Sequence, residues 1–145
     1  MAGYSGTALE RKLGVKDGQM VFLDRPPAGF DLDAPTTRRL GRRLALTLTF
    51  HTRRAELERR FPLLAERTEQ SGAVWVCWPK RTAPERRRGL LVSDLDDGVV
   101  REVGLAAGWV DVKVCAVDET WSALKFVRRL ADRQPGQPAD GAAQP

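Results

Sequence analysis

Two short and almost continuous apolar runs set the strongest limit on how this chain folds. They span residues 44–50 (LALTLTF) and residues 73–78 (AVWVCW). Neither run alternates apolar with polar side chains, as a strand with one solvated face does. Such runs are typical of strands that are covered on both faces, as in a parallel sheet. We therefore expect both to lie inside the sheet.

The segment between the two runs has the pattern of an amphipathic helix. Leu57, Phe61 and Leu64 recur at helical spacing, and Thr52 is placed to cap the first turn. Pro62 lies inside this pattern and is expected to kink or split the helix, because proline lacks an amide donor. A strand, a helix and a strand at this length predict a right-handed βαβ unit.

The N-terminal part of the chain predicts one helix and one strand ahead of this unit. Thr7 and Glu10 have the spacing of a capping box, which predicts a short helix over residues 5–13. Residues 19–24 then read as the first strand. Residues 25–37 are rich in Pro, Asp and Gly, and they predict a loop.

The C-terminal part predicts a loop, a helix and a hairpin. Residues 79–92 lack periodicity and carry two prolines and an arginine run, so they predict a mobile loop. Ser93 is expected to cap the helix that follows, because Asp96 stands three residues further on. Gly108 ends that helix. We expect Val99, Val103 and Ala106 on the buried stripe of the helix, and hairpin strands over 110–117 and 122–129.

These segments together predict an α/β fold. It is a three-layer, Rossmann-like, mostly parallel sheet of about five strands with a C-terminal antiparallel hairpin. One domain over residues 1–130 is expected, and the tail over 131–145 (rich in Pro, Gly and Ala) is expected to be disordered. In the strand over 110–117, Val110, Val112 and Val114 are expected to point inward. The expected buried sheet residues are Val21, Leu46, Leu48, Val74, Val76 and Val112.

The positive charge of the chain is weak support for a nucleic-acid partner. The net charge is +5 at pH 7, and 19 of the 24 basic residues are arginine. Isoleucine and asparagine are absent, so a GC-rich, bacterial genome accounts for part of this arginine content. The basic clusters are also interleaved with carboxylates, as on most solvated surfaces. Nucleic-acid binding is therefore possible but not favoured.

The remaining composition points to a cytoplasmic protein that does not enter a membrane. No apolar run approaches the roughly 20 residues that cross a bilayer, and there is no signal-peptide pattern. Cys77 and Cys115 lie inside apolar runs and read as buried thiols rather than a disulfide. With one histidine and no cysteine pair at ligand spacing, the sequence predicts no metal site.

Polar residues follow the predicted parallel strands at the point where each strand ends. Open α/β sheets bind ligands at this carboxyl edge. We therefore expect the site of an unknown small molecule or protein partner here, without assigning a catalytic residue. The expected ligand-binding residues are Asp24, His51, Lys80, Arg81, Asp118, Glu119 and Trp121.

The stretch DETW over residues 118–121 allows two interpretations. Four residues that link antiparallel strands form a turn, and turns select Asp for local hydrogen bonds. A turn does not need a tryptophan beside two carboxylates, however. Our hypothesis is that Trp121 holds Asp118 or Glu119 toward Lys80 or Arg81 in an ion pair.

Several motifs resemble known families. The stretches EQSGAVWVCWPK (69–80) and VVREVGLAAGWVDVKV (99–114) resemble the second half of Rossmann-like methyltransferases. GYSGTALERKLGVKDG, RRAELERRFPLL, VWVCWPK and VDVKVCAVDETWSALKFVRR together resemble a family of small bacterial proteins of unknown function, over residues 3–130. The resemblance implies a degenerate methyltransferase-like fold and no established reaction.

The chain departs from true methyltransferases after its first strand. Their first strand leads into a glycine-rich turn whose N–H groups approach the cofactor, whereas this one leads into DRPPAG over residues 24–29. Pro26 and Pro27 each lack an amide donor. We therefore expect a non-catalytic binding or regulatory module with no cofactor and no standard nucleotide or S-adenosylmethionine site. The alternatives are an enzyme that acts on a small anionic substrate held by Lys80 and Arg81, or a weak nucleic-acid binder.

Overall fold

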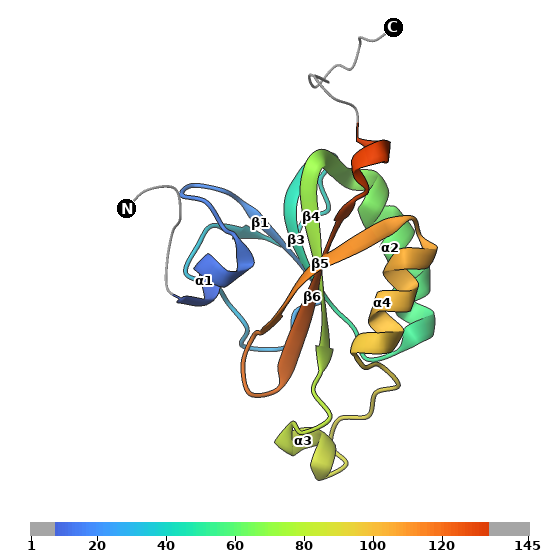
Figure 1. Ribbon diagram of the computed structural model, residues 1–145. Helices are drawn as coiled ribbons and strands as arrows, with labels where there is room; N and C mark the ends of the chain where they lie inside the picture. Colours follow the sequence, from blue (N-terminus) through green and yellow to red (C-terminus); the bar gives the residue numbers. More distant parts are fainter. Residues whose placement is uncertain (1–7, 134–145) are drawn as a thin grey trace, which may run out of the picture.

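The structure is a computed structural model that describes residues 8–133. These residues form a six-stranded sheet with helices on both faces (Figure 1). The elements in chain order are α1 (Ala8–Leu13), β1 (Val21–Asp24), β2 (Thr36–Thr37), β3 (Leu44–Phe50), α2 (Arg54–Arg67), β4 (Thr68–Pro79), α3 (Pro84–Arg87), α4 (Asp97–Ala106), β5 (Trp109–Ala116), β6 (Trp121–Arg128) and a 3-10 turn (Leu130–Asp132).

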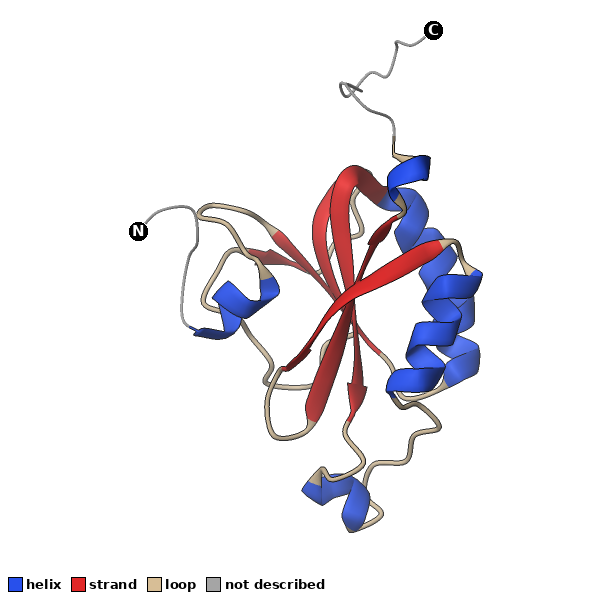
Figure 2. Cartoon of the chain, in the orientation of Figure 1, coloured by secondary structure: helices blue, strands red, loops and turns tan. Residues whose placement is uncertain are grey.

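The strand order across the sheet is β2-β1-β3-β4-β6-β5. The first four strands run parallel, and β6 is antiparallel to both of its neighbours, β4 and β5. Helices α2 and α4 cover one face of the sheet and α1 covers the other, as Figure 2 shows. This arrangement confirms the predicted α/β class and the predicted C-terminal antiparallel hairpin. None of the helices within residues 8–133 is both long and apolar enough to cross a membrane.

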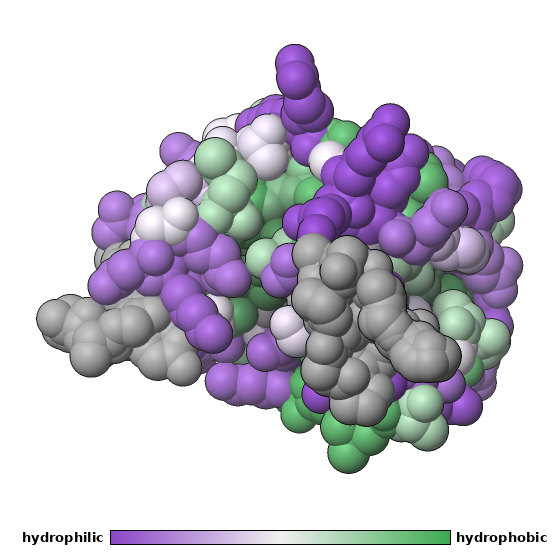
Figure 3. Space-filling view, turned by 90° about the horizontal axis from the view of Figure 1, so that it is seen from above, coloured by the Kyte–Doolittle hydropathy of each residue, from purple (hydrophilic) through white to green (hydrophobic). Residues whose placement is uncertain are grey.

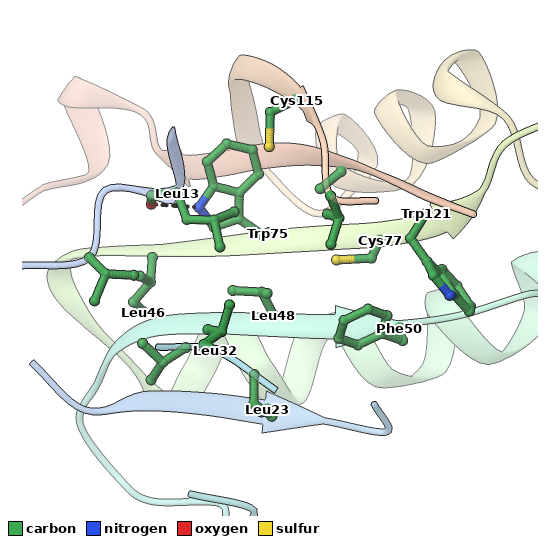
Figure 4. Close-up of a cluster of buried hydrophobic side chains, with 14 of the residues drawn as sticks. Leu13, Leu23, Leu32, Leu46, Leu48, Phe50, Trp75, Cys77, Cys115 and Trp121 are labelled. Atoms are coloured by element: carbon green, nitrogen blue, oxygen red, sulfur yellow. Dashed lines mark hydrogen bonds between the residues drawn. The ribbon is translucent and has the colours of Figure 1, made fainter. Parts of the chain in front are cut away.

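Strand β4 forms the centre of the core, because its residues 73–79 are buried on both faces. On the α1 face, Trp75 lies among leucines from β1, β3 and α1, and its indole N–H donates to the carbonyl of Leu13 at 3.0 Å (Figure 4). On the other face, Val74 and Val76 pack with Phe61 of α2 and with residues of α4. Double-sided burial explains why this run carries no polar alternation.

The predicted core residues are buried with one exception, Val112. Val112 is 54% exposed, and Val114 is exposed as well. The cause is a bulge in β5: Asp111 pairs with Phe126 and Lys113 with Lys125, so Val112 is an extra residue between them. A bulge reverses the alternation of the residues that follow it, and β5 is also an edge strand. The inward orientation predicted for Val112 and Val114 is therefore wrong.

The caps predicted for α2 and α4 are also wrong in detail. The residue before α2 is Arg53, and the first amide of the helix, that of Arg54, donates to the Asp94 carboxylate at 2.7 Å. Asp96 rather than Ser93 caps α4, and its carboxylate accepts from the Val99 amide at 2.9 Å. The cap of α2 thus comes from a residue that is 40 positions away, which no local pattern reveals.

Other boundaries differ from the sequence predictions in smaller ways. Helix α2 runs through Pro62 without being split, and its three predicted apolar residues are buried. The buried stripe of α4 is Val100, Val103 and Gly104. Residues 36–37 of the predicted loop form the short strand β2, and residues 84–87 form the single turn α3. Residues 131–132 of the predicted disordered tail belong to the 3-10 turn (Leu130–Asp132), so the tail prediction is wrong there. Residues 5–7 of the first predicted helix and 134–145 of the predicted tail lie outside the described residues.

Gly104 is a specific packing constraint between α4 and the sheet. A Cβ atom built at Gly104 would overlap the ring of Phe126, which is fully buried on β6. We predict that Gly104→Ala lowers the free energy of unfolding by about 1–3 kcal/mol, because overpacking outweighs the gain in helix propensity. Gly98→Ala in the same helix is the matched control, since its Cβ would meet only the Asp96 carboxylate at 3.5 Å. Urea unfolding of both variants measures the difference, and equal stabilities would contradict this account of the contact.

Candidate functional site

The carboxyl edge of the sheet holds the predicted site residues, but the sheet divides them into separate groups. Asp24 and His51 face α2, where they belong to one buried network. Asp118 and Trp121 lie on the α1 side, at a cleft described below. Lys80 and Arg81 follow the end of β4 and line neither location. The predicted residues are therefore at one edge, but they do not form one site.

The network facing α2 is a chain of short hydrogen bonds. The Thr49 hydroxyl donates to the Asp24 carboxylate at 2.7 Å, and it lies 2.7 Å from Nε2 of His51. The guanidinium of Arg60 donates to both oxygens of the same carboxylate, at 3.0 and 2.7 Å. Asp24 is 5% exposed, so this bidentate pair holds a buried charge in place. Burial alone would raise the pKa of Asp24, but the hydrogen bonds from Arg60 and Thr49 outweigh it and hold the pKa below its ordinary value.

These bonds determine the tautomer of His51. Because the single proton of the Thr49 hydroxyl goes to Asp24, Nε2 of His51 must be the donor in the contact with Thr49. Nδ1 is then an acceptor, and it is buried without a hydrogen-bond partner within the described residues. Burial, together with the charge of Arg25, lowers the pKa of His51 to about 4. His51 is therefore neutral at physiological pH and is not a cation of the site.

On the opposite face, residues 118–121 form a local turn. One oxygen of the Asp118 carboxylate accepts from the amides of Thr120 and Trp121, at 2.8 and 2.7 Å. Trp121 packs edge-to-face on Phe50 with ring centroids 5.2 Å apart, and it stands opposite Pro79 in the register of β4 and β6. The tryptophan is thus at the carboxyl end of the core, as Figure 4 shows. The turn interpretation of Asp118 is confirmed.

The ion pair expected in our hypothesis is wrong. Arg81 pairs with Asp96 at 2.6 Å, and within residues 8–133 no ion pair joins Asp118 or Glu119 to Lys80 or Arg81. Lys80 contributes its backbone instead, through an amide that donates to the Thr120 carbonyl at 2.8 Å. The guanidinium of Arg81 instead donates to Asp96, the cap residue of α4.

A cleft opens at the carboxyl edge between the loop after β1 and the turn before β6. Its volume is about 570 Å³. We call it the edge cleft. Its lining residues come from α1, the loop after β1, the segment around α3 and the turn before β6: Leu9, Pro27, Ala28, Gly29, Phe30, Asp31, Glu85, Leu91, Val117, Asp118, Thr120 and Trp121.

The chemistry of the edge cleft is apolar and acidic. Phe30 and Trp121 form aromatic walls, and both pack against Phe50 from either side. Among residues 8–133, the charged residues of the lining are the carboxylates Asp31, Glu85 and Asp118, and none of the arginines, lysines or the histidine in this part of the chain lines it. Such a cleft favours a cation that carries an apolar or aromatic part.

Each of these carboxylates accepts hydrogen bonds within residues 8–133 of the protein through only one of its two oxygens. Asp31 accepts from the Leu32 amide, and Glu85 accepts from the Thr120 hydroxyl at 3.0 Å. Asp118 accepts through one oxygen only, as described above. Within the described residues, the second oxygen of each carboxylate makes no hydrogen bond or ion pair. The local bonds fix the three side chains, and the second oxygens are available to a ligand.

Sequence reasoning found Asp118 and Trp121 but missed Phe30, Asp31 and Glu85. The missed residues lie in segments that read as plain loops. The first loop is fixed by a turn in which the Phe30 amide donates to the Pro27 carbonyl at 3.1 Å, and by the Asp33 amide, which donates to Glu10 at 2.7 Å. Glu119, which was predicted, does not line the cleft. Within residues 8–133, no three His, Cys, Asp or Glu side chains are grouped closely enough to hold a metal ion.

Comparison with known proteins identifies the fold. No family model matches the chain, and no curated protein sequence matches it. Among solved structures, the mitomycin 7-O-methyltransferase MmcR matches with a TM-score of 0.54 and 13% identity, over 80% of this chain and 42% of that protein. LepI in complex with S-adenosylmethionine matches with a TM-score of 0.52 and 12% identity, over 83% and 39%. The chain thus spans less than half the length of these two proteins, and it has a Rossmann-like methyltransferase fold.

This finding overturns the expected function. A non-catalytic module without an S-adenosylmethionine site was expected because the first strand lacks a glycine-rich turn, yet the same fold occurs in a solved complex with that compound. The prolines remove only their own amide donors, whereas Ala28 and Gly29 line the cleft and retain theirs. The alternative of an anionic substrate fails as well, because Lys80 and Arg81 do not line the cleft.

The buried histidine predicts how stability depends on pH. The pKa of His51 is about 4 in the folded chain against an ordinary value of 6.5, so the unfolded chain binds more protons between these values. We predict that the contribution of His51 to the free energy of unfolding is nearly constant above pH 7 and falls by about 2 kcal/mol from pH 7 to pH 5. Asp24 contributes only below this window, because its pKa is lowered.

The control is His51→Gln, whose side-chain amide keeps a donor for Thr49 but does not titrate. Urea unfolding at pH 7, 6 and 5 should give a sloping profile for the unmodified chain and a flatter one for the variant. Equal slopes for the two proteins would show that His51 is not the titrating group.

Proposed function

We propose that the edge cleft binds S-adenosylmethionine and that the chain is a methyltransferase-type protein. The observation that carries this proposal is the set of three carboxylates, each with a second oxygen available, in a cleft with aromatic walls and no basic side chain. S-Adenosylmethionine carries a sulfonium, an ammonium and a carboxylate, so its net charge is positive, and its aromatic base has the stacking surface that this lining favours. The fold shared with MmcR and LepI adds support.

The aromatic and the acidic residues of the lining would bind different parts of the compound. Phe30 is partly exposed and offers a ring against which an adenine can stack, whereas Trp121 is 8% exposed and presents only a small part of its ring to the cleft. Asp31, Glu85 and Asp118 line the cleft and would hold the positive charges. The amides of Ala28 and Gly29 are the donors left to the turn after β1, where the usual glycine-rich sequence is replaced. The residues present therefore fit the cationic and aromatic parts of the compound.

When bound, S-adenosylmethionine supplies an activated methyl group that a nucleophile on a second molecule accepts. The part of this chain is to bind and orient rather than to supply a covalent group. Leu91, with Glu85, brings the segment around α3 to the mouth of the cleft, where it would limit the access of water. The carboxylates also stabilise a cation more than a neutral product, which favours release of the product.

The difference in charge between S-adenosylmethionine and its product provides a direct test. We predict that S-adenosylmethionine binds more tightly than S-adenosylhomocysteine, because the product has lost the sulfonium charge. Removing two carboxylate charges in the double variant Glu85→Gln and Asp118→Asn should weaken S-adenosylmethionine by about tenfold, at roughly 0.5–1 kcal/mol for each partly exposed charge. The affinity for the product, S-adenosylhomocysteine, should fall by less in the same variant. Isothermal titration calorimetry of both compounds measures these differences.

The matched control is Glu119→Gln, which removes the same charge one residue from Asp118 but outside the cleft. Both amide replacements in the double variant keep the acceptor oxygen that holds the turn, so folding is not the variable. Absence of S-adenosylmethionine binding at about millimolar concentration, or an equal loss in the control, would refute the proposal.

Two finer predictions from the sequence remain part of this proposal. They are membership of the small bacterial family suggested by the motif over residues 110–129, and a location in the cytoplasm.

A further inference from the structure

A second hollow lies beside the end of β1, lined mainly by residues of α2. It has a volume of about 250 Å³ and is lined by Arg25, Glu56, Arg59, Arg60 and Leu63. We call it the arginine pocket. The four residues from α2 share one face of that helix, and Arg25 comes from the turn after β1. The pocket shares no lining residue with the edge cleft.

Arg60 is held in position before any ligand binds. Its Nε and one terminal nitrogen donate to the two oxygens of Asp24, and Asp24 is fixed in turn by Thr49. The other terminal nitrogen makes no hydrogen bond within the described residues. A guanidinium with fixed orientation and a remaining donor is the arrangement that recognises a tetrahedral oxyanion.

Arg25 has an unusual backbone conformation. Its φ of 57° makes it the only residue other than glycine with positive φ within residues 8–133. This conformation costs free energy in a residue with a Cβ atom, and such costs concentrate at functional positions. Its pair with Glu56 spans 3.6 Å between half-exposed side chains, which offsets little of that cost. The conformation brings the Arg25 side chain to the pocket.

The charges around the pocket do not balance. Asp24 neutralises Arg60, and Glu56 lies against Arg25, whereas Arg59 makes no ion pair within residues 8–133. The group as a whole is therefore positive. Arg59 lies one turn of α2 beyond Glu56, on the side of the helix that lines the pocket. The N–H donors of its guanidinium are therefore available on the same side as those of Arg25 and Arg60.

We propose that the arginine pocket binds a phosphate group, free or as the ester of a small molecule. Three arginines and one glutamate line a hollow of about 250 Å³, which leaves a net positive charge and suits one phosphate rather than an extended polyanion. The assignment is independent of the edge cleft, because the two locations have opposite charge and no common residue.

The test uses inorganic phosphate with the whole chain and two readouts. At constant ionic strength, about 10 mM phosphate should raise the melting temperature by a few degrees, given a Kd of about 1 mM. The same titration is followed by NMR of the histidine ring. The chain contains one histidine, and the charges of Arg25 and Arg60 act on it, so the ring resonances of His51 should move with the same Kd.

Two variants remove donors without disturbing the fold. Arg59→Gln should weaken phosphate about tenfold, as expected for one charged hydrogen-bonding partner. Arg25→Gly relieves the positive φ, so it should be at least as stable as the unmodified chain while it loses the response to phosphate. Arg53→Gln is the matched control, since it removes the same charge from an exposed position next to the start of α2.

The phosphate responses of the three variants distinguish binding in the pocket from binding elsewhere. A response that is weakened about tenfold in Arg59→Gln and lost in Arg25→Gly, but kept in Arg53→Gln, supports the pocket. No shift of the melting temperature or of the His51 resonances, or an equal response in all three variants, overturns it. A second titration with glycerol 3-phosphate distinguishes the sources: tighter binding than the free ion assigns the pocket to a phosphate ester, and equal binding assigns it to phosphate itself.

Discussion

The burial of β4 on both faces is the constraint on which the rest of the structure depends. A strand with no solvated face needs helices on each side, so α1 must pack opposite α2 and α4. Trp75 fixes the α1 layer, because its indole fills the space beneath the helix and its N–H reaches the carbonyl of Leu13. A buried indole without that acceptor would leave an unpaired donor in the core. Packing and hydrogen bonding therefore place α1 and the loop after β1 over one end of the sheet.

The position of the edge cleft follows from this layering. Leu9 of α1 and the loop that contains Phe30 reach the carboxyl edge on the same side as the turn before β6. The opposite end of the molecule, where β4 begins, is mostly hydrophilic on its surface (Figure 3). The sheet then separates two charge environments, since the edge cleft carries carboxylates and the arginine pocket carries guanidinium groups. On the two proposals made above, one small fold offers a cation site and an anion site.

The sequence predicted the layers well because they depend on patterns within single segments. The two apolar runs, the stripe of Leu57, Phe61 and Leu64, and the final hairpin are all local signals, and the structure has each of them. The errors in the sequence predictions arise where contacts between segments that are distant in the sequence determine the local structure. Asp94 caps α2 from a distant loop, and a bulge in β5 turns Val112 outward. Arg81 forms its ion pair with Asp96 instead of with the turn over residues 118–121.

The candidate site was predictable in position but not in composition. Parallel topology alone places Asp24, His51 and Asp118 at one edge, yet it does not tell which face each side chain occupies. Phe30, Asp31 and Glu85 belong to loops whose conformation depends on tertiary bonds, such as the one between Asp33 and Glu10. Pro26 and Pro27 remove two amide donors after β1, but they do not close the cleft beside them.

The central claim is that S-adenosylmethionine occupies the edge cleft. The most direct measurement is an NMR titration of the indole N–H resonances, since the chain has four tryptophans in distinct environments. Trp121 lines the cleft, whereas Trp75 is fully buried and bonded to Leu13. The account predicts that S-adenosylmethionine moves the Trp121 indole and the amides of residues 28–31 while the Trp75 indole stays unchanged. A titration that leaves Trp121 unmoved, or that moves only signals around Arg25 and Arg59, would contradict it.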